Sequence, residues 1–212
     1  MNRKSLLIAA LCVLISSNVS ATPIVDFSGG STTFGGGDFS VGYTFSITSS
    51  QTINGLSWWD EGGDGLASNH DVGLWTIAGT LLASTTITNG STSEVSSSGF
   101  GNWMVESFTN LTLGIGDYVV GGVQTNSIGG DLLRTNASSS SISGVVFGDA
   151  IQNTSNGLTL TMPTEIVTSA NDGAWGPNVH FTSAAVPEPA SLALLGLGLA
   201  GIGFSRKRRL LK

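Results

Sequence analysis

Positive charge is scarce in this sequence except at its two ends. Of the eight Lys and Arg residues, two lie in the first four positions and five in the last seven, which leaves only Arg134 between them. The stretch from Thr22 to Val186 holds 13 of the 14 acidic residues, so its net charge is 1 − 13 = −12 with neutral histidines. Such a surface repels phosphate backbones, which argues against a nucleic-acid partner. It attracts cations, and calcium is the obvious one outside a cell.

Cysteine and histidine are also rare, which excludes several kinds of site. The only cysteine is Cys12, close to the N-terminus, so the rest of the chain can form neither a disulfide bond nor a thiolate metal site. The two histidines are His70 and His180, and neither a G-x-S-x-G turn nor an H-E-x-x-H helix is present. We therefore expect no enzyme activity and interpret His70 as a loop residue. A carboxylate pair for glycoside hydrolysis stays open, because such a pair is defined only by its separation in space.

The first 21 residues have the three parts of a secretory signal peptide. Arg3 and Lys4 supply positive charge, residues 6–15 are apolar, and Val19-Ser20-Ala21 is a cleavage sequence with small side chains. The apolar run is too short for a bilayer, which needs about 20 residues. We expect signal peptidase to cleave after Ala21; an uncleaved anchor is the alternative.

The C-terminal end reads Val186-Pro187-Glu188-Pro189, then an apolar stretch at 190–204, then Arg206-Lys207-Arg208-Arg209. The prolines disfavour helix just before them, so a helix is expected from about Ala190 onward. Its apolar length is near the minimum for a membrane span, and Lys and Arg beside a span stay in the cytoplasm. The sequence thus predicts an exported body with a transmembrane helix at its C-terminus.

This three-part tail resembles the PEP-CTERM sorting signal. Proteins with that signal are processed by exosortase, a membrane-embedded enzyme that cuts near the Pro-Glu-Pro motif and discards the helix. The resemblance implies that Pro187, Glu188 and Pro189 are the recognition element and that Arg206 to Arg209 form the retention cluster. It also implies a transient stay in the cytoplasmic membrane, then the cell surface or extracellular matrix. The alternative is a permanent C-terminal anchor with a proline-containing stalk.

Residues 22–185 are expected to form one all-β domain. Helix signals are nearly absent there, and short strand patterns recur between clusters of Gly, Asn and Ser. Many short antiparallel strands favour a jelly-roll-like β-sandwich ectodomain. Strands are expected at 43–47, 71–77, 80–87, 103–108, 117–123, 143–147, 158–162 and 178–182.

One acidic loop and one tryptophan pair are candidate ligand sites. Asp60, Asp64 and Asp71 have spacings found in calcium-binding loops, although the flanking strands exclude an EF-hand. A solvated acidic turn is the plainer interpretation. Trp58 and Trp59 are adjacent, so on a strand they point to opposite faces. One ring could then stack on a sugar, unless a loop or a neighbouring strand covers it. The other tryptophans, Trp75, Trp103 and Trp175, are expected in the core.

Three domains of the chain follow: a signal peptide at 1–21, a β-sandwich at 22–185 and a sorting signal at 186–209. The resemblance implies a structural or adhesive role in an exopolysaccharide layer, the biofilm matrix, with no cofactor required beyond a possible Ca²⁺. The alternative is a secreted carbohydrate-binding module, calcium-stabilised or not. A glycan-active hydrolase is a third hypothesis.

Overall fold

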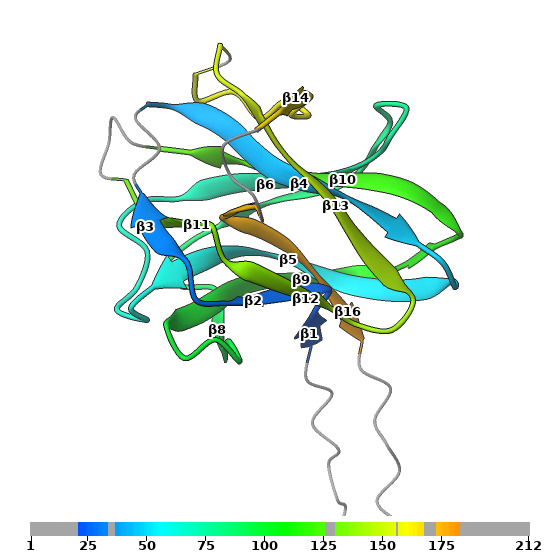
Figure 1. Ribbon diagram of the computed structural model, residues 1–212, viewed down its shortest axis with the longest axis horizontal. Coiled ribbons are helices and arrows are strands. Elements are labelled where there is room, and N and C mark those ends of the chain that lie inside the picture. The colour runs from blue at the N-terminus through cyan, green and yellow to red at the C-terminus, as the bar shows by residue number, and fades with distance from the viewer. Residues whose placement is uncertain (1–20, 34–36, 126–129, 156, 168–172, 183–212) are drawn as a thin grey trace, which may run out of the picture. The chain divides into compact units, whose positions relative to one another are not determined.

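The computed structural model describes residues 21–33, 37–125, 130–155, 157–167 and 173–182. All strand pairings in these ranges are antiparallel, and no helix occurs there. Two large sheets and two small ones build the body at Ala21–Thr182 (Figure 1). The all-β prediction is confirmed, and the arrangement is consistent with a β-sandwich; the jelly-roll connectivity stays a prediction.

The first large sheet has five strands in the order β1-β16-β5-β9-β8. Its strands are β1 (Ala21–Pro23), β16 (Pro177–Thr182), β5 (Gln51–Glu61), β9 (Gly101–Leu113) and β8 (Thr92–Val95). The second has six strands in the order β14-β13-β4-β10-β6-β7. Its strands are β14 (Glu165–Ile166), β13 (Val145–Asn153), β4 (Phe39–Ile47), β10 (Gly116–Gln124), β6 (His70–Thr76) and β7 (Leu81–Ile87).

Two small sheets complete the body. One pairs β15 (Ala174–Trp175) and β3 (Ser31–Thr33) on either side of β11 (Leu133–Thr135). The other pairs β2 (Val25–Ser28) with β12 (Ser138–Ser141). Phe27 on β2 contacts both Trp59 on β5 and Trp175 on β15, so aromatic packing joins the small sheets to the large ones.

The buried amide of Asn178 ties three strands together. Its Oδ1 accepts a hydrogen bond from the Tyr43 hydroxyl at 2.6 Å, and its Nδ2 donates to the Val25 carbonyl at 2.6 Å. Burial raises the pKa of Tyr43 well above its ordinary value, so the phenol stays neutral and keeps donating. Because a buried polar group without partners is costly, this network fixes the relative positions of β4, β16 and β2.

A row of glycines crosses the outer face of the six-stranded sheet. Gly42, Gly121 and Gly73 are direct partners on β4, β10 and β6. A Cβ at Gly121 would lie 2.5 Å from Pro163 Cδ, and a Cβ at Gly73 would overlap the Trp75 ring. Because Gly121 and Gly73 have no side chain, the rings of Pro163 and Trp75 can pack against the sheet at these positions. There Trp75 belongs to a second apolar cluster with Val119 and Ile151.

Most of the predicted strands are present, and one is not. The strand predicted at 158–162 is wrong: this segment is irregular, and its Leu160 and Met162 pack on the second apolar cluster instead. The alternation of its side chains reflects contact with the sheet face rather than membership of the sheet. Trp103 and Trp175 are fully buried in the main core, as expected, and Trp75 is buried on the outer face.

The glycine row predicts a sharp loss of stability on adding one methyl group. In the Gly42→Ala variant the Cβ would collide with the Val120 carbonyl oxygen and lie 2.7 Å from Gly121 Cα, both backbone atoms that cannot move independently. We expect the free energy of unfolding in urea to fall by about 2 kcal/mol or more. Gly114→Ala is the control, because no atom lies within 4 Å of its built Cβ. Equal stability of the two variants would contradict the steric explanation.

Candidate functional site

The acidic loop between β5 and β6 brings two of its three predicted calcium ligands together. Asp60 is buried at the end of β5 and accepts a hydrogen bond from the Gly65 amide at 3.1 Å. Burial, followed by the charges of Asp64 and Asp131, raises the pKa of Asp60 above its ordinary value. Asp71 lies apart on β6, where its Oδ1 accepts a hydrogen bond from the Thr86 hydroxyl at 2.6 Å.

This geometry does not assemble a metal site from side chains alone. Within the described ranges, no group of three or more His, Cys, Asp or Glu side chains is placed to hold a metal ion. Asp60 and Asp71 instead hold their own loop and strand pair in place. Calcium binding by Asp60, Asp64 and Asp71 therefore stays a prediction from the sequence.

The same loop is anchored by a buried ion pair that the sequence did not reveal. His70 is the first residue of β6 rather than a loop residue, and its Nε2 lies 2.8 Å from Asp131 Oδ2. Its Nδ1 lies 2.8 Å from the carbonyl oxygen of Val123. Both partner atoms are oxygens, so the ring lies between two hydrogen-bond acceptors. The imidazole also stacks on Trp58, with ring centroids 4.0 Å apart.

Asp131 connects this pair to the loop backbone. Its Oδ1 accepts from the Ala67 amide at 2.8 Å, and its Oδ2 accepts from the Ser68 amide at 3.2 Å. Burial alone would raise the pKa of Asp131, but the hydrogen bonds and the charge of His70 outweigh burial, so the pKa lies below its ordinary value. The ionised carboxylate thus stabilises the fold above its ordinary pKa of 3.8, and this contribution is lost as pH falls through the lower folded value.

Of the two interpretations of the tryptophan pair, the one in which both rings are covered holds. Trp58 and Trp59 do point to opposite faces of β5, but both have 0% exposure. Trp58 is covered by His70, and Trp59 packs edge-on against Phe27 and Trp103. A small sheet therefore covers the face that the sequence left open, and neither ring is available to stack on a sugar.

The single base of the body is also buried. Arg134 forms an ion pair with Glu61 and donates from Nη1 to the Gly29 carbonyl at 2.9 Å. Its guanidinium lies 3.9 Å from the centre of the Phe100 ring. Glu61 also accepts a hydrogen bond from the Trp59 indole at 2.8 Å. Because Arg134 is paired inside the body, its positive charge does not offset the acidic residues at the surface.

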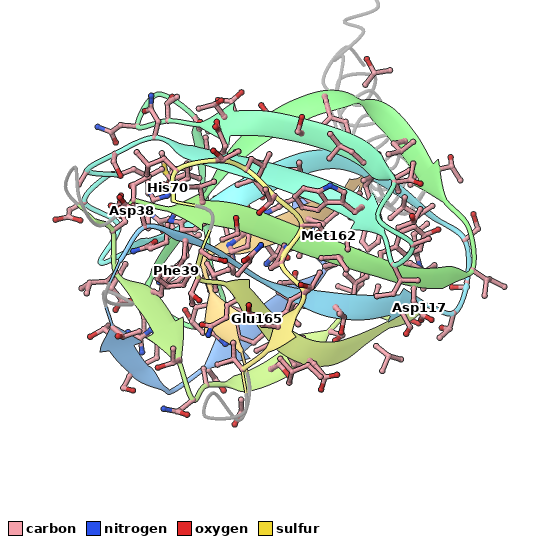
Figure 2. All side chains as sticks on the ribbon, turned by 90° about the horizontal axis from the view of Figure 1, so that it is seen from above. Asp38, Phe39, His70, Asp117, Met162 and Glu165 are labelled. Atoms are coloured by element: carbon pink, nitrogen blue, oxygen red, sulfur yellow. The ribbon has the colours of Figure 1, made fainter. Side chains whose placement is uncertain are left out.

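An open groove lies on the outer face of the six-stranded sheet. It consists of two adjoining hollows of about 240 and 290 Å³ that share Thr44, Ile77 and Asp149. Apolar side chains line one part, and the carboxylates of Asp117 and Asp149 line another. The apolar residues are Val119, Ile151, Met162, Pro163 and Ile166. Figure 2 shows Met162 above this face, with Asp117 toward one end of the body and His70 toward the other.

A β-bulge shapes the groove. The pairing of β13 with β4 shifts between Phe147 and Ala150, which places Asp149 opposite Thr44, and the Asp149 amide donates to the Thr44 hydroxyl at 2.8 Å. Asp117 accepts a hydrogen bond from the Ser46 hydroxyl at 2.6 Å. Bulges re-aim side chains next to functional sites. The groove was not predicted, because it depends on which strands are neighbours and on the covering segment near Met162.

The predicted sorting residues, Pro187 to Pro189 and Arg206 to Arg209, lie outside the described residues, as does the motif's Val186. What the structure does place is the base of that tail. β1 and β16 pair at the edge of the five-stranded sheet, so Ala21 is the direct partner of Thr182. No helix in the described ranges is long and apolar enough to cross a membrane.

Comparison with known proteins finds a match at the C-terminal end of the chain. A family model described as the PEP-CTERM protein-sorting motif matches residues 185–209. The chain is therefore an exported protein with a C-terminal sorting signal. That signal is the PEP-CTERM motif predicted from the sequence, and it indicates sorting by exosortase to the cell surface or the extracellular space. The comparisons with curated proteins and with solved structures gave no match.

The Asp131 network predicts a loss of stability with a distinct pH dependence. The Asp131 carboxylate has four hydrogen-bond partners, namely the Ala67 amide, the Ser68 amide and hydroxyl, and the His70 ring. In Asp131→Asn only one acceptor oxygen remains for them, and the negative charge beside His70 is lost. We expect the free energy of unfolding to fall by about 3 kcal/mol at neutral pH. The fall in stability between mildly acidic and strongly acidic pH should also be shallower than in the wild type.

Urea unfolding across a pH series measures both effects. Asp149→Asn is the matched control, since Asp149 is an exposed carboxylate whose removal should change stability by less than about 0.5 kcal/mol. A loss for Asp131→Asn no larger than for this control would show that the ion pair does not hold the loop.

Proposed function

We propose that this chain is a structural or adhesive protein of an extracellular polysaccharide layer, without catalytic activity. The single observation that carries the proposal is the sorting motif at 185–209, which directs the all-β body out of the cell. The body fits such a role because its polar side chains mainly serve its own fold. His70, Asp131, Arg134 and Glu61 are all engaged in internal ion pairs. We further propose that signal peptidase and then exosortase process the two ends, with a transient stay at the membrane between these steps.

Processing at the C-terminus is the direct test of this proposal. In cells that contain exosortase, mass spectrometry of the native protein should find an end near Pro187-Glu188-Pro189, without the apolar stretch and the basic cluster. In cells without the enzyme the tail should stay attached. Replacing all three motif residues by alanine should have the same effect as removing the enzyme. An intact tail on the secreted protein in enzyme-containing cells would refute the sorting step.

Carbohydrate binding is the second candidate function, and the groove is the observation that favours it. A groove that combines aliphatic surface with a few polar groups is the usual form of a small-ligand site. The carboxylates of Asp117 and Asp149 can accept hydrogen bonds from sugar hydroxyls, and Thr44 and Ser46 can add further ones. In this hypothesis the groove, and not the buried Trp58–Trp59 pair, is the carbohydrate-binding site.

Glycan binding through the groove predicts a specific mutational pattern. Asp149→Asn and Asp117→Asn should each weaken binding about tenfold, the effect of losing one charge-assisted hydrogen bond. Glu94→Gln is the control, because Glu94 lies on β8 in the other large sheet. Titration of polysaccharide purified from the producing cells measures the effect. Binding that survives both groove substitutions would place the ligand elsewhere.

A further inference from the structure

The strand pairings place four turns at the same end of the body as the base of the tail. Thr182 ends β16 there, and the turn between β4 and β5 and the turn between β9 and β10 meet next to it, since Gln51 pairs with Leu113. The turn between β12 and β13 joins them, because Gly144 accepts a hydrogen bond from the Thr48 amide at 2.9 Å. The fourth is the turn between β6 and β7, where the Ile77 amide donates to the Asp117 carbonyl. We call this region the tether end.

The tether end is uncharged in its turns and exposes aliphatic side chains. The turns at 48–50, 77–80, 114–115 and 142–144 contain no Asp, Glu, Lys or Arg, in a body with 13 acids and one base. Ile115 stands at the tip of one turn with 77% of its surface exposed. Three more large aliphatic residues at this end are exposed: Ile77, Leu81 and Val146. Asp117, bonded to Ser46, is the nearest acid.

Acidic residues gather at the opposite end. β5 ends there with Asp60 and Glu61, and β6 begins there with His70 and Asp71. Asp64 and Asp131 belong to the same loop region. Figure 2 shows this separation along the length of the body, with Asp38 and His70 near one end and Asp117 at the other. The body is therefore polarised in charge: an acidic end lies opposite Thr182, and an end with no charged residue in its turns lies beside Thr182.

We propose that the tether end lies against the lipid surface of the membrane while the C-terminal tail holds the chain there. This inference rests on the proposed function, because it requires the tail to be in the membrane before exosortase acts. Eight peptide units separate Thr182 from Ala190, where the apolar stretch begins, so the two are at most about 28 Å apart. A linker of this length keeps the base of the body close to the lipid headgroups.

The chemistry of the two ends determines which one meets the lipid. Anionic headgroups repel the acidic end, while the tether end presents no carboxylate in its turns. Exposed aliphatic side chains at a membrane surface gain free energy by entering the boundary between headgroups and acyl chains. The lipid contact would fix the orientation of the body on the membrane before exosortase acts. After cleavage, a few isolated aliphatic side chains are too little surface for stable binding, so the body leaves the membrane.

Because the body contains no cysteine, a single introduced cysteine can be labelled to test this contact. The chain carrying Cys12→Ser is exported in cells that lack exosortase, purified with its tail, and reconstituted in vesicles of phosphatidylethanolamine and phosphatidylglycerol with a quencher-labelled lipid. A fluorophore is attached through Ile115→Cys at the tether end. The matched control is Val95→Cys at the far end of β8, where the native side chain is 85% exposed. We expect quenching of the Ile115→Cys label to be severalfold stronger.

The outcomes distinguish a failure of the lipid contact from a failure of the proposed function. If alkaline extraction releases the protein from the vesicles, the tail is not inserted and the membrane step of the proposed function fails. If the tail resists extraction but both labels are quenched equally, only the lipid contact is refuted. If the Ile115→Cys label becomes protected without lipid as protein concentration rises, the tether end binds a second copy of the chain instead, which also overturns the inference.

Discussion

Aromatic packing is the interaction on which the rest of this structure depends, because it joins all four sheets. Phe27 of the β2–β12 sheet stacks on Trp175 of the three-stranded sheet at 5.4 Å and meets Trp59 of the five-stranded sheet at 4.7 Å. Trp175 in turn contacts Tyr43 and Phe147 of the six-stranded sheet. The body has no cysteine for a disulfide, so this continuous set of rings supplies the cross-links between layers that covalent bonds provide in many exported domains.

The charged side chains of the body also contribute to its stability. Several carboxylates hold loops that have little apolar surface of their own. Asp26 accepts hydrogen bonds from Ser96 and Ser97, which outweigh its burial and lower its pKa. Arg134 neutralises Glu61 under the Phe100 ring, and Asp131 holds the acidic loop. What remains for function is an acidic surface with two distinct regions, the groove with its two carboxylates and the tether end with its uncharged turns.

Local sequence patterns predicted the strands well because alternation and turn residues act over a few positions. They could not show what covers a strand. Trp58 and Trp59 alternate as expected, but the sequence did not show that Phe27, about 30 positions earlier in the chain, packs on Trp59. His70 was misplaced for the same reason, since its partner Asp131 is 61 residues away. The sorting motif was recognised because its residues follow one another in the sequence. The groove could not be predicted, because it forms only where β13, β4 and β10 lie side by side.

The pairing of β1 with β16 links export to folding. Ala21 is both the last residue of the predicted leader and the partner of Thr182, the last residue before the tail. Cleavage after Ala21 removes this pair and leaves Thr22 with Phe181 and Pro23 with His180. A peptidase acts on an extended, accessible chain, so we expect the proposed cleavage to precede the closing of β1 on the edge of the sheet. The new N-terminus can then pair with β16 and shield the edge from which the sorting tail departs.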